Sequence, residues 1–271
     1  MEKLKFSVSM CVYGGDSPIW FREALESIYN QTRLPDEVVL QVDGPVSKEI
    51  DSVISHFQEI YGMRVYRLEK NSGHGIARRE CLEHCNYDYV AIADADDINV
   101  PTRFEKQIAC FEKDPTLSAV SSWCYHFTEN INNILNEEKI PVTDEDIKEY
   151  IKKRCPLCQA STMFKKAKVE EVGGYVDWYC AEDYYLWVRM ALQGAKFYNV
   201  PESLLYVRSD NGQSKRRGGW KYYKSMRDLF RYMRKNKMIS LGGYIYNTTS
   251  RFVMQVLMPS KIRSFIRKKF L

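Results

Sequence analysis

The sequence contains 271 residues, of which 45% are hydrophobic and 28% are charged. This length predicts one large domain, or one domain with an appendage, whose core needs no disulfides to be stable. No apolar run reaches the roughly 18 residues that would cross a bilayer, so no membrane-spanning helix is expected.

The net charge of +5 is unevenly distributed along the chain. Residues 211–271 carry 16 Lys and Arg against one acid, Asp228, whereas the first 210 residues carry 24 basic and 34 acidic residues. The C-terminal segment is therefore the basic surface for a partner. A nucleic-acid-binding protein would account for this tail but not for the acidic body, and we expect no nucleic-acid partner.

Eight cysteines are scattered along the chain, at positions 11, 81, 85, 110, 124, 155, 158 and 180. The first five residues include three charged ones and the apolar stretch after them is too short for a signal peptide, so we expect reduced thiols in a cytoplasmic protein. The CPLC segment at 155–158 lacks the second pair that a four-thiolate zinc site needs. Cys81, His84 and Cys85 likewise lack a fourth ligand. Buried structural cysteine is the simpler interpretation of both groups.

Apolar, β-prone segments alternate with helical periodicity from the N-terminus to residue 93. Strands are expected at 6–13, 37–42, 63–68 and 90–93, with helices beginning at Pro18, running through 53–60 and spanning 76–85. A glycine-containing loop, Asn71-Ser72-Gly73-His74-Gly75, leads into the third helix. This order predicts a parallel sheet covered by helices on both faces, with right-handed crossovers.

The remaining segments are predicted in the order helix 101–113, strand 117–127, a polar, Asn-rich segment 129–138, an acidic helix introduced by 143–146, strand 160–164 and an apolar helix 184–193. Beyond Tyr206 the composition changes. A basic, flexible segment at 215–219 precedes a basic helix at 220–237 and tail segments at 244–257 and 261–270. No internal repeat is found.

Three carboxylates, Asp94, Asp96 and Asp97, follow directly after the apolar run Val90–Ala93. Repulsion between clustered carboxylates is costly without a counter-charge, which a divalent cation would supply. Ligands of open α/β sheets gather beyond the carboxyl ends of the strands, where these residues are expected. A solvated turn that caps the next helix, with Pro101 in its first turn, is the alternative.

Six blocks carry a family resemblance in their order and spacing: FSVSMCVYGG, ALESIYNQT, EVVLQVDGP, NSGHGIARRECLEHC, YVAIADADDINVPTRFEKQ and VGGYVDWYCAEDYYLWVRMA. Together they resemble the family 2 nucleotide-sugar glycosyltransferases over residues 6–206. RCPLCQASTMFKK and SKRRGGWKYY resemble the bacterial enzymes of capsular and exopolysaccharide synthesis. The resemblance implies an α/β protein: a Rossmann-like GT-A domain at 1–209, with a mostly parallel sheet flanked by helices, and a basic helical extension at 210–271.

The resemblance places the nucleotide at the ends of the first two strands. Cys11 and Tyr13 would lie against the base, and Asp43 would accept from the uracil N3–H. Many relatives carry two aspartates at this turn, whereas this chain has Val42-Asp43, so the role is carried onto Asp43 alone. An Asp that only makes an Asx turn before Gly44-Pro45 is the alternative.

Asp94-Ala95-Asp96 matches the DXD motif of the family. By that pattern Asp94 approaches the ribose, and Asp96 coordinates Mn²⁺ or Mg²⁺ together with diphosphate oxygens and water. The cation would neutralise charge on the departing nucleoside diphosphate. Asp97 either contacts the metal through water or caps the next helix, and the cap is favoured.

Glu182-Asp183 matches the acidic pair near the acceptor in this family. In inverting members the Asp is the general base that removes the proton of the acceptor hydroxyl as the hydroxyl attacks the anomeric carbon. Glu182 would position the acceptor or assist. The alternative to a catalytic role is structural: the helix dipole favours acidic residues at a helix N-terminus.

Basic and aromatic residues complete the predicted site. Arg78 and Arg79 either reach the diphosphate of the sugar donor or are solvated on the third helix. Arg78 is the one of the two that we predict to bind the nucleotide-sugar. Lys215, Arg216 and Arg217 suit a mobile clamp for phosphate groups, with a solvated charge run as the alternative. The aromatic side chains around the acidic pair are expected to be mostly core, although some suit stacking on sugar rings: Trp178, Tyr179, Tyr184, Tyr185 and Trp187.

The resemblance implies an inverting, metal-dependent transferase that moves a hexose, with galactose favoured, from a UDP-sugar to a glycan. A sugar-nucleotide pyrophosphorylase would need a glycine- and lysine-rich phosphate loop after the first strand, which residues 14–18 do not supply. The alternative is a scaffold that keeps the GT-A fold and binds nucleic acid or membrane. Such a scaffold would be expected to lack Asp43, Asp96 or Asp183, and all three are present.

The last segment, 251–271, mixes apolar residues with Lys and Arg. This composition suits a helix that lies on the anionic inner face of the cytoplasmic membrane, beside a polyprenyl-diphosphate-linked acceptor. We therefore expect a cytoplasmic protein that is peripheral on that membrane. A packing or dimerisation helix, and with it a homo-oligomer, stays open as the alternative.

Overall fold

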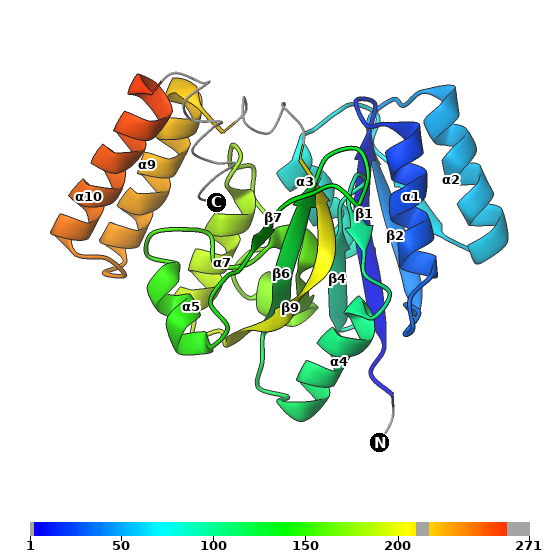
Figure 1. The fold of residues 1–271 in the computed structure, drawn as a ribbon, viewed down its shortest axis with the longest axis horizontal. Helices are drawn as coiled ribbons and strands as arrows, with labels where there is room; N and C mark the ends of the chain where they lie inside the picture. The colour runs from blue at the N-terminus through cyan, green and yellow to red at the C-terminus, as the bar shows by residue number, and fades with distance from the viewer. Residues whose placement is uncertain (1–2, 210–216, 259–271) are drawn as a thin grey trace.

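The computed structural model describes residues 3–209 and 217–258 (Figure 1). Lys215, Arg216 and residues 259–271 of the predicted basic tail lie outside the described residues. The described part contains a twisted sheet with helices on both faces (Figure 1).

The nine-stranded sheet has the order β3-β2-β1-β4-β8-β6-β9-β5, with β7 added beside β6. Its strands are β1 (Phe6–Tyr13), β2 (Glu37–Asp43), β3 (Arg64–Arg67), β4 (Tyr89–Ala93), β5 (Ile98–Asn99), β6 (Ala119–Phe127), β7 (Ile134–Glu138), β8 (Met163–Lys165) and β9 (Phe197–Arg208). β1 pairs in parallel with β2 and β4, and β2 with β3, as the first half of the sequence predicts. β8 is antiparallel to both β4 and β6, so the complete sheet is mixed.

The helices are α1 (Pro18–Tyr29), α2 (Lys48–Tyr61), α3 (His74–Glu83), α4 (Arg103–Lys113), α5 (Asp144–Tyr150), α6 (Lys166–Glu170), α7 (Glu182–Leu192), α9 (Gly219–Lys235) and α10 (Leu241–Phe252), with a 3₁₀ turn at Gln159–Ser161 and a π-helical turn at Val253–Leu257. Their starts follow local sequence signals. The predicted acidic helix begins where expected, because the Thr143 hydroxyl accepts from the Asp146 N–H and caps α5.

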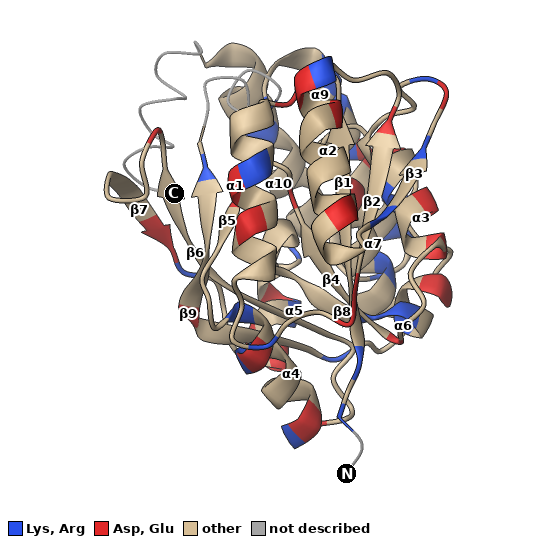
Figure 2. Ribbon diagram, turned by 90° about the vertical axis from the view of Figure 1, so that its right-hand side faces the viewer, with Lys and Arg blue, Asp and Glu red and all other residues tan. Residues whose placement is uncertain are grey.

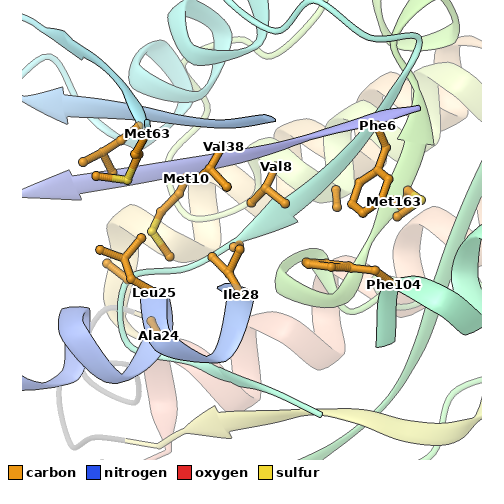
Figure 3. Packing of buried hydrophobic residues seen from close by; sticks show 14 of the residues in the cluster. Phe6, Val8, Met10, Ala24, Leu25, Ile28, Val38, Met63, Phe104 and Met163 are labelled. Carbon is orange, nitrogen blue, oxygen red and sulfur yellow. The ribbon is translucent and has the colours of Figure 1, made fainter. Parts of the chain in front are cut away.

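The period-2 alternation of the strands divides the core between the two faces of the sheet. Val38, Leu40 and Val42 of β2 pack with α1, α2 and α4, whereas Val39 packs with α3, α7 and α9 on the other face. Figure 3 shows the first cluster, in which Leu25 and Ile28 of α1 lie beneath the apolar side chains of β1. The central strands β1 and β4 carry no charged residue, and the charges gather on the helices and at the strand ends (Figure 2).

Several elements were not predicted from the sequence: β5, β7, β9 and α6. β7 lies in the polar, Asn-rich segment and, among the described strands, pairs only with β6, and none of its residues is buried. β9 is interrupted by Pro201-Glu202-Ser203, and its pairing with β6 shifts register near Trp123. Both strands depend on a partner distant in sequence, and neither shows clean alternation of apolar and polar residues.

Helices α9 and α10 lie side by side at one end of the molecule, opposite α1 and α2 (Figure 1). The apolar face of α9 packs in the same cluster as Trp187 of α7, through Met226, Leu229 and Phe230. No helix among the described residues is long and apolar enough to span a membrane.

Candidate active site

The carboxyl ends of three adjacent strands bring the predicted donor residues to one edge of the sheet. Tyr13 at the end of β1 lies in register with Asp43 at the end of β2, and Asp94 follows directly after β4 on the other side of β1. The Tyr13 side chain is 42% exposed at this edge. The Cys11 thiol instead turns inward, where it hydrogen bonds with Cys81 of α3.

Asp43 is buried and binds the loop before α3. Its two carboxylate oxygens accept from the backbone N–H groups of Ser72 at 2.7 Å and Gly73 at 3.1 Å. Gly44 has a φ of +84°, and a Cβ there would lie 2.5 Å from the Asn71 nitrogen, so the close approach of the two segments requires glycine. Asp43 therefore positions the loop Asn71–Gly73, a role beyond that of an Asx turn before Gly44.

Arg78 is 1% exposed and forms an ion pair with Asp94. Burial is the largest influence and opposes its charged form, but Asp94 and the other groups around the guanidinium, Glu182 among them, together outweigh burial and raise the pKa of Arg78 above its ordinary value. The solvated alternative is thus wrong for Arg78. Arg79, in contrast, is exposed and pairs with Glu80.

His74 links this ion pair to the predicted acidic pair. Its Nε2 lies 3.0 Å from Arg78 Nε, and its Nδ1 lies 2.7 Å from Glu182 Oε1. Because a guanidinium nitrogen only donates, Nε2 accepts, and the proton of the neutral ring is on Nδ1, where it donates to Glu182. Burial raises the pKa of Glu182, but His74, a backbone hydrogen bond and the charge of Arg78 together outweigh burial, so the pKa is lowered. A continuous polar chain therefore runs from Asp94 to Glu182.

Asp183, the predicted base, follows at the first turn of α7. Burial, followed by the charge of Glu182, raises the pKa of Asp183 from 3.8 to about 6. Its Oδ1 accepts from the Tyr184 N–H at 2.7 Å, and the Cys155 thiol approaches Oδ2 at 3.8 Å. A carboxylate with a pKa near neutrality suits proton abstraction at neutral pH.

Asp97 does not cap the next helix, so that prediction was wrong. It is 3% exposed, and its Oδ1 accepts from the Arg208 N–H of β9 at 2.9 Å. Thr102 is the N-cap residue of α4. Burial, followed by the charges of Asp96 and Asp94, raises the pKa of Asp97 well above its ordinary value. Such clustered hard oxygen donors fit a divalent cation of the Mg²⁺ or Mn²⁺ type, which would relieve the repulsion.

Residues 7–173 match the family described as Glycosyl transferase family 2. The chain belongs to this family. A UDP-Gal:alpha-D-GlcNAc-diphosphoundecaprenol beta-1,3-galactosyltransferase from Escherichia coli is 37% identical to it over 266 residues, covering 98% of this chain and 96% of that protein.

Two solved structures show the same fold as this family 2 glycosyltransferase. The mannosyltransferase PcManGT from Pyrobaculum calidifontis, in complex with GDP-Man and Mn²⁺, has a TM-score of 0.67 at 17% identity, covering 92% of this chain and 70% of that one. TarS 1–349 from S. aureus, in complex with UDP-GlcNAc, has a TM-score of 0.66 at 16% identity, covering 99% of this chain and 77% of that one.

The basic clamp predicted for this glycosyltransferase is described only at Arg217. The charge of Arg217 acts on Asp183 and opposes the rise of its pKa. Lys215 and Arg216 lie outside the described residues. Among the aromatic neighbours, Tyr184 and Trp187 are buried, as expected for core residues.

Sequence reasoning missed three residues of the site: His74, Cys155 and Arg208. Arg208 donates from Nε to the backbone oxygen of Asp96 at 3.0 Å and pairs with Glu23. Its position at the end of an unpredicted strand gave no signal. His74 lies within the glycine-containing loop 71–75 that the sequence analysis names. A titratable side chain next to a predicted helix start was the signal that could have indicated it.

Proposed function

We propose that this family 2 glycosyltransferase is an inverting, metal-dependent enzyme. It moves a hexose, with galactose favoured, from a UDP-sugar to a glycan carried on a polyprenyl diphosphate. The observation that carries the proposal is the polar chain Asp94–Arg78–His74–Glu182, which joins the strand-end carboxylates to an acidic pair with a base of pKa about 6. The galactosyltransferase name of the E. coli relative supports the choice of donor and acceptor.

The donor would bind at the carboxyl edge of β1, β2 and β4. The exposed Tyr13 ring offers a face for the base, with Cys11 behind it, and Asp43 keeps a lone pair on each oxygen for the uracil N3–H. Asp94 would contact the ribose, and Arg78 fixes the position of its carboxylate. Lys215, Arg216 and Arg217 would contact the phosphates. The complex of TarS with UDP-GlcNAc supports a uridine nucleotide.

Asp96 would hold the Mn²⁺ or Mg²⁺ ion at this edge. Burial, followed by the charges of Asp96 and Asp94, raises the pKa of Asp97, and these neighbouring carboxylates support a counter-ion at this edge. The ion would neutralise charge on the departing diphosphate. The Mn²⁺ complex of the Pyrobaculum enzyme supports this assignment.

Asp183 would accept the proton of the acceptor hydroxyl as that hydroxyl attacks the anomeric carbon from the face opposite the diphosphate. Glu182 stays ionised because His74 donates to it, so it can accept from a second acceptor hydroxyl and orient the sugar. Buried side chains around α7 limit the access of competing water to the base.

The C-terminal helices, in the predicted extension 210–271, would dock on the inner face of the cytoplasmic membrane. Apolar side chains recur along the exposed surface of α10 and the turn after it: Leu241, Ile245, Tyr246, Val253 and Leu257. The neighbouring helix α9 carries several basic residues, and a helix pair with both kinds of side chain suits anionic lipid. Self-association through the same apolar stripe is the competing use.

Calorimetric titration of UDP into the purified protein, with and without Mn²⁺, tests the donor site. We expect binding that requires the metal, and an Asp96→Ala variant that has lost this dependence. Asp88→Ala is the matched control, since this exposed Asp lies at the opposite end of β4 and should leave binding unchanged. Absence of UDP binding in every condition would favour the non-catalytic scaffold.

Sedimentation with vesicles of phosphatidylglycerol tests membrane docking. The double variant Leu241→Glu, Ile245→Glu places charge within the exposed stripe and should remain in the supernatant, whereas the parent protein should sediment. Sedimentation that the variant leaves unchanged, or a parent that never sediments, would contradict the membrane role.

A further inference from the structure

A second group of metal-binding side chains lies on β6 and β7. Cys124 and His126 are two residues apart on β6 and therefore share one face of the sheet. Glu138 of the antiparallel strand β7 lies directly opposite Cys124. The thiol sulfur, a ring nitrogen and a carboxylate oxygen of these residues all lie within 4.8 Å of one another.

The surroundings orient these three side chains toward a common point. His126 Nδ1 lies 3.1 Å from Ser209 Oγ, so Nε2 faces Glu138 Oε2 at 2.9 Å. A hydrogen bond to the other ring nitrogen is the usual support of a histidine that ligates a metal. Cys124 is fully buried and hydrogen bonds with the thiol of Cys158.

The small apolar cluster around the sulfur limits the access of water on that side. It contains Cys124, Ala160 and Leu205, with Cys158 and Val207 packed against them. The thiol therefore has a dry environment, while the Glu138 carboxylate is 43% exposed. The Glu138 side of the group therefore faces solvent.

We propose that Cys124, His126 and Glu138 bind one Zn²⁺ ion, with the fourth position left to water. A thiolate, an imidazole and a carboxylate form a ligand set that zinc takes in tetrahedral sites. Metal–ligand bonds of about 2.0–2.3 Å place ligand atoms roughly 3.3–3.8 Å apart, so closure of the site needs movements of about 1 Å. Binding displaces the Cys124 thiol proton to solvent, and the ion takes the lone pair of His126 Nε2 while Nδ1–H donates to Ser209.

The ion would fix the edge strand β7, which the described sheet pairs only with β6. It would also hold the CPLC segment, because Cys158 contacts Cys124 and Cys155 of the same segment contacts Asp183. Its three ligands do not include Asp96, and the proposal does not depend on the proposed transferase activity.

Zinc retention by the full-length chain tests the proposal. The protein is incubated with one equivalent of Zn²⁺ under reducing conditions, dialysed, and analysed for zinc by elemental mass spectrometry. We expect about one zinc per chain in the parent protein and loss of the retained zinc in His126→Gln and in Glu138→Gln, each of which lacks one of the three proposed ligands. These two side chains are partly exposed, so both variants should fold. Glu137→Gln is the matched control, because this neighbouring carboxylate faces away and binds Ser203.

Cobalt substitution gives a readout that identifies the sulfur ligand. Co²⁺ bound to the protein should show a thiolate-to-cobalt charge-transfer band, absent in Cys124→Ser and retained in Cys81→Ser, whose buried thiol lies on α3. Three results would overturn the proposal: no zinc retained by the parent protein, retention that His126→Gln and Glu138→Gln leave unchanged, or loss of the zinc in Asp96→Ala.

Discussion

Replacing Asp183 with Asn should stabilise the fold at neutral pH while abolishing sugar transfer. Burial and the charge of Glu182 raise the pKa of Asp183 from 3.8 to about 6, so the folded state favours the protonated carboxyl more than the unfolded chain does. Its contribution is therefore fully present below pH 4 and is lost as the pH rises through about 6.

The shift of about two pKa units corresponds to about 3 kcal/mol of destabilisation once the carboxylate is ionised. Asn keeps an oxygen that can accept from the Tyr184 N–H but carries no charge, so Asp183→Asn should recover about 2–3 kcal/mol above pH 7. The same variant lacks the proposed base, and transfer to the acceptor should fall to background. Stability and catalysis are thus opposed at one residue.

Urea unfolding of both proteins between pH 4 and pH 8 measures the effect. The free energy of unfolding should differ by about 2–3 kcal/mol above pH 7, and the difference should shrink toward zero near pH 4. The exposed Asp177, changed to Asn, is the control and should alter stability by less than about 0.5 kcal/mol. The reasoning would be refuted if the variant were less stable than the parent protein above pH 7. It would also be refuted if the difference in the free energy of unfolding did not change with pH.

Two further predictions concern the polar chain. Arg78→Met removes the partner of Asp94 and should lower the free energy of unfolding in urea by about 3–5 kcal/mol. Arg79→Met, on the exposed face of the same helix, is the control and should lower it little. Equal losses of stability in the two variants would contradict the ion pair of Arg78. His74→Ala removes a group that lowers the pKa of both Glu182 and the proposed base Asp183, so the acidic limb of the pH–rate profile should move to higher pH, while His74→Gln should restore it in part. An unshifted profile would show that His74 has no electrostatic role.

The first half of the fold could be predicted because each strand and helix there carries its own signal. β1, β2 and β4 are apolar runs with a strand-end carboxylate or turn, and the intervening helices bury one regular face. β9 could not be found in this way, since Pro201 and its polar neighbours break the pattern, and pairing with β6 is what makes it a strand.

The candidate site was predicted residue by residue, but its contacts were not. The strand-end positions of Asp43 and Asp94 follow from local pattern, whereas the partners that determine their chemistry come from loops and helices distant in sequence. Asp97 illustrates the limit: an Asp shortly before a helix suggests a cap, yet its carboxylate binds Arg208, more than a hundred residues further along the chain.

The polar chain from Asp94 to Glu182 also restricts how this protein can change over generations. Each member satisfies a donor or acceptor of the next, so replacing one alone leaves a charged or hydrogen-bonding group without its match. We expect the four positions to vary together or not at all. Attempts to alter sugar preference should therefore leave these four residues unchanged and vary positions outside the polar chain.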